Sequence, residues 1–249
     1  MERTVLIGYG LLVALFAVLF WTLGLSLGQI ISIPSLSIVI IGCISGMLLS
    51  CSAADVQKAV KAMKAAFAPW TSRDAELIDD IVKVANQARR DGLLSLEGVR
   101  KEIRDPVLAQ LVKYVMDGLE LREVREVLHT RAEESKEEAL ASVRVWEVGA
   151  QFAPSLGLIG AILGFVQTLA HPAQGGGQNQ ALVSGMVSAF LSVLYGILFA
   201  QFLFMPLASR LKSLVDRQSK AFQILEMGIS GVVDGESPTT LKEKLEALL

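Results

Sequence analysis

Two long stretches of this chain contain only uncharged residues, and apolar side chains dominate both of them. Residues 4–54 and residues 148–209 contain no Asp, Glu, Lys or Arg. A helix that crosses a membrane needs about 20 mostly apolar residues, so each stretch has room for two spans and a short turn. The pattern therefore predicts an all-α membrane protein with four transmembrane helices.

Polar segments with Gly and Pro interrupt each stretch once, at residues 26–35 and 171–180. Such residues favour turns and exposure to water, so each segment is a predicted loop between two spans. The predicted spans one to four are about 4–27, 35–54, 149–170 and 181–207. The start of the chain lacks a clear cleavage site, and span one is expected to be an uncleaved membrane helix.

The positive charges predict how the chain is oriented. All 23 Lys and Arg residues lie at Arg3, in 55–147 and in 210–249. Positively charged segments stay on the cytoplasmic side. Both termini and residues 55–147 are therefore expected in the cytoplasm of a bacterium, with a multi-pass protein in its inner membrane. The predicted domains are spans one and two at 1–54, a cytoplasmic helical domain at 55–147, spans three and four at 148–209, and a cytoplasmic helical tail at 210–249.

The predicted cytoplasmic domain has the signals of helices and none of strands. Asp105-Pro106 is typical of a helix N-cap followed by proline at the first helical position, and Gly118 ends that helix. From Glu120 to Trp146 charges of both signs alternate without a helix breaker, which predicts one long helix that runs directly into span three.

The tail is expected to form two helices. The first is amphipathic, follows span four and contains Leu211 and Leu214, and a short second helix follows Ser237-Pro238.

Composition excludes several classes of protein. Hydrophobic residues make up 52% of the chain, the mean hydropathy is +0.50 and the formal net charge is −2. This apolar excess argues against a soluble globular or disordered chain. A nearly neutral charge gives no support for nucleic-acid binding.

No enzyme site is evident in the sequence. Cys43 and Cys51 both fall in span two and suit small core residues, while His129 and His171 lack partners at metal-ligand spacing. No nucleophile–base pair or phosphate loop is present. The sequence therefore predicts no catalytic residue, no metal site and no cofactor.

The predicted spans lack the ionisable residue that ion-moving membrane proteins normally place within the bilayer. The chain is therefore either a structural membrane protein or a channel subunit whose carboxylate comes from a partner helix. Small residues recur every four positions in spans three and four, at Ala153, Gly157 and Ala161 and at Ser188, Ser192 and Gly196. This spacing allows close helix contacts, either within the chain or with a partner or pore.

Two prolines lie near the inner ends of spans three and four. Pro154 and Pro206 each remove a backbone donor and crowd the preceding turn. They are candidate kinks or hinges, or they mark helix ends.

Six motifs together resemble the flagellar stator A subunits, the MotA/PomA family, over nearly the whole chain. They are FAPSLGLIGAILG at 152–164, LYG at 194–196 and MPLA at 205–208 in the spans, and ARRDGLLSLE at 88–97, MDG at 116–118 and GESP at 235–238 outside them. Each motif alone is modest, and their combination and order are specific.

The resemblance implies a stator subunit of the bacterial flagellar motor that couples ion flow to torque. Five A chains would surround two B-type chains, whose single span carries an ion-binding Asp and whose other domain anchors to peptidoglycan. By motif position, Arg89 and Glu97 would contact the rotor switch complex. Pro154 and Pro206 would couple ion occupancy to movement.

The resemblance also bears on the coupling ion. Sodium-driven members usually carry three Thr residues at the positions of Ala161, Ser192 and Val193. Together with Ser188, these three positions are the predicted lining of the ion path or of the partner helix. Desolvated sodium needs several oxygen ligands, so we expect proton coupling, although Tyr195 also occurs in sodium-type members.

Other functions remain open at this point. One is a sodium-driven stator of the same family. Another is an ExbB/TolQ-like energiser of outer-membrane processes. Such proteins usually have three spans, and the uncharged stretch 4–54 argues against this alternative because it is long enough for two spans by itself. The third is a membrane scaffold without ion flux, which would assemble without a B-type partner.

Overall fold

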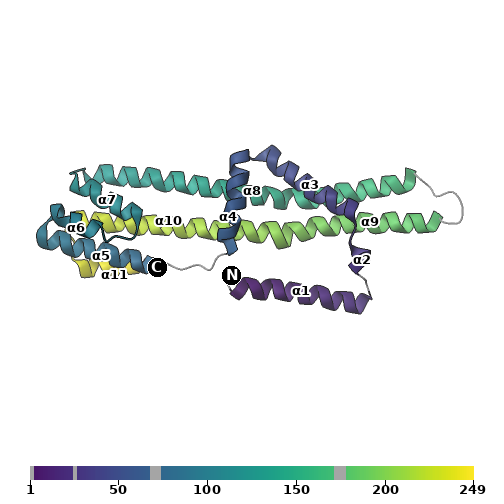
Figure 1. Cartoon of the computed structure of the whole chain (residues 1–249), viewed down its shortest axis with the longest axis horizontal. Coiled ribbons are helices and arrows are strands. Elements are labelled where there is room, and N and C mark those ends of the chain that lie inside the picture. Colours follow the sequence, from purple (N-terminus) through teal and green to yellow (C-terminus); the bar gives the residue numbers. More distant parts are fainter. Residues whose placement is uncertain (1–2, 25–26, 68–73, 171–177) are drawn as a thin grey trace. The chain divides into compact units, whose positions relative to one another are not determined.

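The computed structural model describes residues 3–24, 27–67, 74–170 and 178–249, and every regular element in these ranges is a helix (Figure 1). Two elements depart from α geometry: η1 is a 3-10 helix and η2 is a π-helix. In chain order the elements are α1 (Arg3–Leu23), α2 (Leu27–Ile30), α3 (Ile33–Ser50), α4 (Ala53–Phe67), α5 (Asp74–Asp91), η1 (Leu93–Ser95), α6 (Leu96–Arg100), α7 (Pro106–Met116), α8 (Leu121–Ala170), α9 (Gln178–Leu198), η2 (Phe199–Phe204), α10 (Met205–Val233) and α11 (Pro238–Glu246).

Several of these helices are long and apolar enough to cross a membrane. By length and composition they are α3, the apolar part of α8 and the segment Val183–Val233. The apolar part of α1, Ile7–Leu23, is shorter. The prediction of an all-α protein with membrane-spanning helices is therefore confirmed at this level.

The expected helix limits agree with the structure in most places. The helix predicted from Glu120 into span three is confirmed, because α8 runs for 50 residues without interruption. Span two is shorter than predicted, since α3 ends at Ser50 and α4 already begins at Ala53. The loop predicted between spans three and four falls mainly on residues 171–177, which lie outside the described ranges.

The chain divides into two compact units, and the long helices α8 and α10 contribute to both. The first unit comprises residues 1–69 and 140–212, and the second comprises residues 70–139 and 213–249. The first unit therefore contains the apolar helices. The second contains most of the charged helices, and the two segments that form it are separated by more than 70 residues of sequence. The domain boundaries predicted at 54, 147 and 209 separate membrane-spanning segments from cytoplasmic ones, and they stay predictions.

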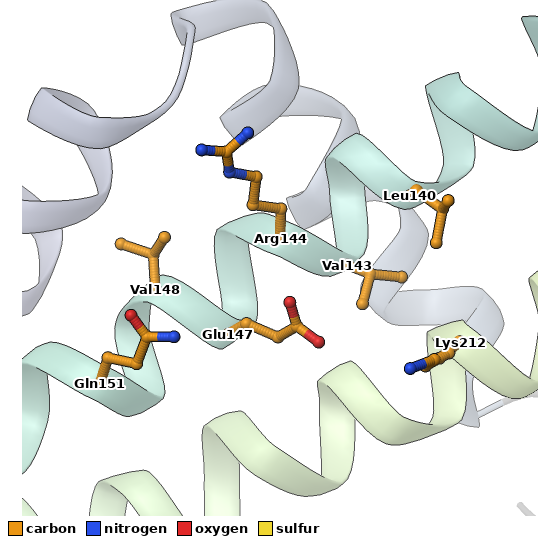
Figure 2. Close-up of a pocket in the computed structure, with 7 residues that line it drawn as sticks. All are labelled: Leu140, Val143, Arg144, Glu147, Val148, Gln151 and Lys212. Atoms are coloured by element: carbon orange, nitrogen blue, oxygen red, sulfur yellow. The ribbon is translucent and has the colours of Figure 1, made fainter.

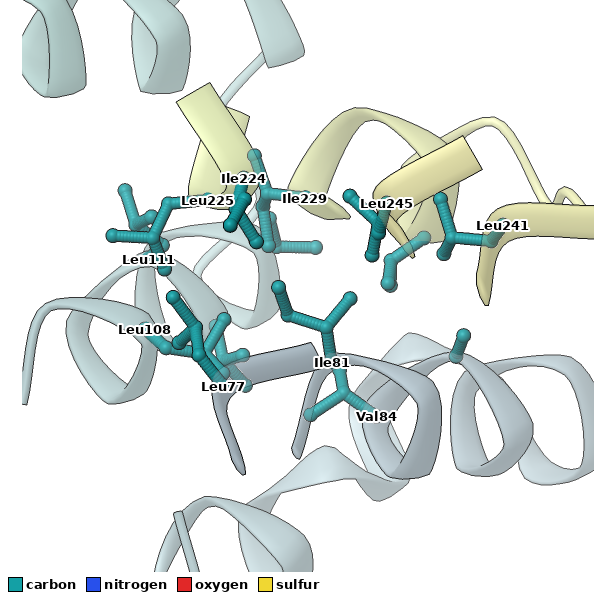
Figure 3. Close-up of a cluster of buried hydrophobic side chains, with 14 of the residues drawn as sticks. Leu77, Ile81, Val84, Leu108, Leu111, Ile224, Leu225, Ile229, Leu241 and Leu245 are labelled. Carbon is teal, nitrogen blue, oxygen red and sulfur yellow. The ribbon is translucent and has the colours of Figure 1, made fainter. Parts of the chain in front are cut away.

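The second unit is built around its own apolar core (Figure 3). Ile81 of α5, Leu108 of α7, Ile229 of α10 and Leu241 of α11 are each at most 1% exposed. The amphipathic pattern of α5 follows from this packing, because one face meets the core and the other carries its charges. Burial of these side chains is the main force that joins the tail to residues 70–139.

Predicted cap residues begin and end α7. The Asp105 carboxylate accepts hydrogen bonds from the backbone N–H groups of Val107 and Leu108, both at 2.9 Å, directly before Pro106 opens α7. Gly118 follows α7 with a φ of 82°, a conformation that disfavours side chains. The sequence signals at 105–106 and 118 are therefore confirmed.

A buried carboxylate fixes the segment that precedes α7. Asp80 is 3% exposed, and its Oδ2 accepts a hydrogen bond from the backbone N–H of Arg104 at 3.2 Å. Its Oδ1 lies 3.2 Å from Nζ of Lys83. Both carboxylate oxygens thus have a donor, which offsets the cost of burying the charge. The turn before α7 is held on α5 in this way.

Candidate functional site at the apolar helices

The helices α8 and α9 approach each other backbone to backbone. A Cβ atom placed on Gly196 of α9 would lie 2.5 Å from the carbonyl oxygen of Ala153 and 3.1 Å from Cα of Gly157 in α8. A Cβ atom on Gly157 would lie 2.8 Å from the carbonyl oxygen of Ser192. The small residues at these positions therefore form a helix contact within the chain, one of the two interpretations that their spacing allowed.

The predicted ion-path residues occupy different positions around this contact. Ser192 is fully buried and its hydroxyl faces Gly160, where an added Cβ would lie on top of it. Within the described ranges this hydroxyl has no hydrogen-bond partner. Ala161 is buried, and Val193 is partly exposed with its Cα opposite Gly157. The contribution of these residues to an ion path stays a prediction.

Ser188, the fourth of the predicted ion-path residues, instead faces α3. Its Oγ lies 3.0 Å from Oγ of Ser35 and 3.3 Å from Oγ of Ser32. The Ser35 hydroxyl also donates to the backbone carbonyl of Ser188 at 2.9 Å. Since these groups lie among apolar helices, their mutual hydrogen bonds replace the water that they lack. The three hydroxyls therefore join α3 to α9 at a polar point.

Tyr195 attaches the short link between α2 and α3 to α9. Its hydroxyl accepts a hydrogen bond from the backbone N–H of Ser32 at 2.9 Å and donates one to the carbonyl of Ile30. These two backbone groups flank the break between helices, where regular helical partners are missing. This role was not predicted, because the contact joins residues more than 160 positions apart, and the only signal was a hydroxyl within an apolar stretch.

Both predicted torque-coupling prolines lie inside continuous helix. Pro154 is an interior residue of α8, and Pro206 lies in a helical run that continues from α9 through η2 into α10. The interpretation of either proline as a helix end is therefore wrong. The π-helical turn η2 ends at Phe204, two residues before Pro206, and a wider turn there relieves the crowding that a proline ring causes. The role of both prolines in torque stays a prediction.

Charged residues lie at both ends of the uncharged stretch 148–209, which begins within α8 and ends near the start of α10 (Figure 2). A cavity of about 450 Å³ is lined there by Leu140, Val143, Arg144, Glu147, Val148, Gln151 and Lys212. Arg144 and Glu147 precede the uncharged stretch 148–209, and Lys212 follows it. The two ends of the uncharged stretch thus lie beside one cavity, as expected for two spans that return to the side of the membrane from which they started.

The predicted rotor-contact residues Arg89 and Glu97 lie on the surface of the second unit. Both are exposed, Arg89 in the last turn of α5 and Glu97 in α6. Gly92 has a φ of 83° and turns the chain between them, while the fully buried Leu96 anchors the turn. Leu94, in the same turn, is 81% exposed. This turn therefore presents several charges, Arg89 and Glu97 among them, and one apolar side chain, Leu94, that sequence reasoning did not single out.

Among the described residues, the cysteines and His129 do not belong to a cluster of possible metal ligands. Both Cys43 and Cys51 are free, and the described ranges contain no group of three or more His, Cys, Asp or Glu side chains that could hold an ion. His129 lies 3.6 Å from a carboxylate oxygen of Glu133 on the surface of α8. His171 lies outside the described residues.

The contact between α8 and α9 yields a direct prediction. Gly196→Ala places a methyl group 2.5 Å from the backbone oxygen of Ala153, which cannot rotate away. Overpacking of this kind costs about 1–3 kcal/mol, so less protein should accumulate in the membrane and its thermal denaturation midpoint should fall. Gly10→Ala is the matched control, because no atom of the chain lies within 4 Å of its added Cβ. Equal behaviour of the two variants would contradict the close contact.

Comparison with known proteins agrees with this arrangement. The sequence model of the MotA/TolQ/ExbB proton channel family matches residues 99–224. Motility protein A of Helicobacter pylori is 31% identical over 220 residues, covering 87% of this chain and 83% of that protein. The structure of C. jejuni MotAB superposes with a TM-score of 0.91 at 27% identity, over 100% of this chain and 96% of that one.

A second solved structure, the flagellar MotAB stator complex from Bacillus subtilis, superposes with a TM-score of 0.86 at 25% identity. It covers 99% of this chain and 96% of that one. The likeness thus includes the apolar helices and the charged helices alike. The chain belongs to the MotA/TolQ/ExbB proton channel family and, within it, to the Motility protein A subunits.

Proposed function

We propose that this chain is the A subunit of a flagellar stator, which forms an ion channel with a B-type partner and converts ion flow into torque on the rotor. The observation that carries the proposal is the pairing of a full-length likeness to MotAB chains with two apolar stretches, 4–54 and 148–209, that contain no Asp, Glu, Lys or Arg. A channel needs a group that holds the ion within the bilayer. A B-type helix with an Asp would supply that group.

The proposed topology has four spans in the bacterial inner membrane, with both termini in the cytoplasm. The spans are α1, α3, the apolar part of α8, and α9 with the start of α10. Support comes from the confinement of Lys and Arg to Arg3, 55–147 and 210–249. The charged cavity at Arg144, Glu147 and Lys212 is further support, since both ends of the second uncharged stretch meet there.

The proposed assembly is a ring of five copies around two B-type chains, as the resemblance to the stator family implies. Many large apolar side chains of α8 and α9 remain exposed in the single chain, among them Leu158, Ile162 and Phe190. Lipid, neighbouring copies and the partner helix would cover such a surface. The B-type chains would anchor the ring to peptidoglycan.

The proposed rotor contact is the turn with Arg89, Leu94 and Glu97. Exposed charges are individually weak and screened by salt. They therefore orient the stator against the rotor switch complex more than they hold it there. The fully buried Leu96 keeps the backbone of this turn in place.

Reversal of a single charge tests this contact. Arg89→Glu should strongly reduce swimming while the amount of protein in the membrane stays at the level of the unchanged chain, because the side chain is exposed. Arg122→Glu, an equally exposed change at the start of α8, is the matched control and should leave swimming intact. Unchanged swimming of the Arg89→Glu strain would remove the rotor contact from the proposal.

The proposed coupling ion is the proton. The positions of Ala161 and Val193 carry no oxygen, and Ser192 offers one hydroxyl, whereas a desolvated sodium ion needs several oxygen ligands. Swimming speed should follow the proton-motive force and should not change when sodium is replaced by potassium at constant membrane potential. A speed that rises and falls with sodium would favour the sodium-driven alternative.

Two other functions fit the observations less well. An ExbB/TolQ-like energiser falls in the same broad family, but the likeness to MotAB chains extends over the whole chain, including the segment before residue 99 where the family model begins. A scaffold without ion flux would explain the uncharged helices. It gives no reason for the likeness to stator chains.

A further inference from the structure

Pro206 leaves one backbone carbonyl of its own helix without the usual donor. In a regular α-helix the N–H of residue 206 would donate to the carbonyl of Phe202, four residues earlier, and a proline has no N–H. Phe202 lies in the uncharged stretch 148–209, where water is scarce and an unpaired carbonyl costs free energy. The helix must therefore either distort or find an outside donor at this point.

Both responses occur here. The π-helical turn η2 shifts the ladder, and the N–H of Met205 donates to the carbonyl of Ala200, five residues earlier. The carbonyl of Phe202 accepts a hydrogen bond from the hydroxyl of Tyr9 at 2.9 Å. Tyr9 belongs to α1, 193 residues away in sequence. A different helix thus supplies the donor that the proline removes.

The surroundings of this bond leave room beside the proline. A cavity of about 240 Å³ is lined by Gly8, Tyr9, Leu12, Phe67, Phe202, Pro206 and Arg210. One turn after the proline, Nη1 of Arg210 donates to the carbonyl of Ala66 at the end of α4, at 3.2 Å. Most of the lining is apolar. The Tyr9 hydroxyl and the Arg210 guanidinium are therefore the strong hydrogen-bond donors near Pro206.

We propose that Tyr9 is a positioning residue for Pro206: its hydroxyl donates to the carbonyl that the proline frees and so fixes the helix around Pro206 relative to α1. The proposal rests on the proposed function only where torque is concerned. A movement of this part of the helix away from α1 must break or lengthen the bond, and the cavity beside it provides the space. One hydrogen bond changes such an equilibrium by about threefold to tenfold.

A double-mutant cycle tests the link between the two residues. The chain is purified from membranes in detergent together with whatever copurifies with it, and thermal denaturation midpoints are measured for Tyr9→Phe, Pro206→Ala and both changes together. Tyr9→Phe removes only the hydroxyl and should lower the midpoint by about 2–4 °C. In the Pro206→Ala background the helix regains its own donor for Phe202, so the same change should lower the midpoint no further.

The control removes another hydroxyl from α1. Thr22 donates only to carbonyls of its own helix, Val18 at 3.0 Å and Leu19 at 3.1 Å, so Thr22→Val should leave the midpoint within error. If Tyr9→Phe lowers the midpoint equally in both backgrounds, or not at all with Pro206 present, the proposal is wrong. These thermal measurements hold whatever the function of the chain.

Torque is the second measurement. In cells that contain wild-type amounts of the protein, Tyr9→Phe should reduce the stall torque, whereas Thr22→Val should not. Unchanged torque in the Tyr9→Phe strain would overturn the role of Tyr9 in the motor. If the unchanged chain drives no motor, the proposed function is contradicted instead. The thermal double-mutant cycle then decides alone whether Tyr9 positions Pro206.

Discussion

Hydrocarbon offers no hydrogen bonds, and most features of the first unit follow from that constraint. Backbone groups in the uncharged stretches are satisfied within helices. Where a proline interrupts the ladder, the Tyr9 hydroxyl supplies the missing partner. The Tyr195 hydroxyl bonds the backbone groups at the break between α2 and α3, at Ile30 and Ser32. Two tyrosine hydroxyls thus serve irregular points of the backbone.

The same constraint explains why a partner is needed. Serine hydroxyls can join helices, as Ser35 and Ser188 do, but they do not take up and release a proton near neutral pH. Charges begin only at the ends of the uncharged stretches, for example at Glu147 and Lys212. In the proposed stator, the chain provides the packing of the helices, the candidate hinges at its prolines and the proposed surface for the rotor. The group that binds the ion has to come from another helix.

The sequence predicts individual helices well and their mutual orientation poorly. The long α8, the cap at Asp105 and the turn at Gly118 follow from local rules, since each depends on residues a few positions apart. Ser188 and Ser192 share one stripe of a helix, yet the first faces α3 and the second faces α8. Such differences depend on how helices cross, and no spacing rule contains that information. The hydrogen bond between Tyr9 and Phe202 could not be predicted from the sequence for the same reason.

Proton flux into sealed vesicles tests the central claim most directly. The chain reconstituted alone should pass no more protons than empty vesicles, because its predicted spans contain no Asp, Glu, His, Lys or Arg. Reconstitution with the B-type partner should produce a flux that disappears when the partner's membrane Asp is changed to Asn. A substantial proton flux through the chain alone would contradict the account.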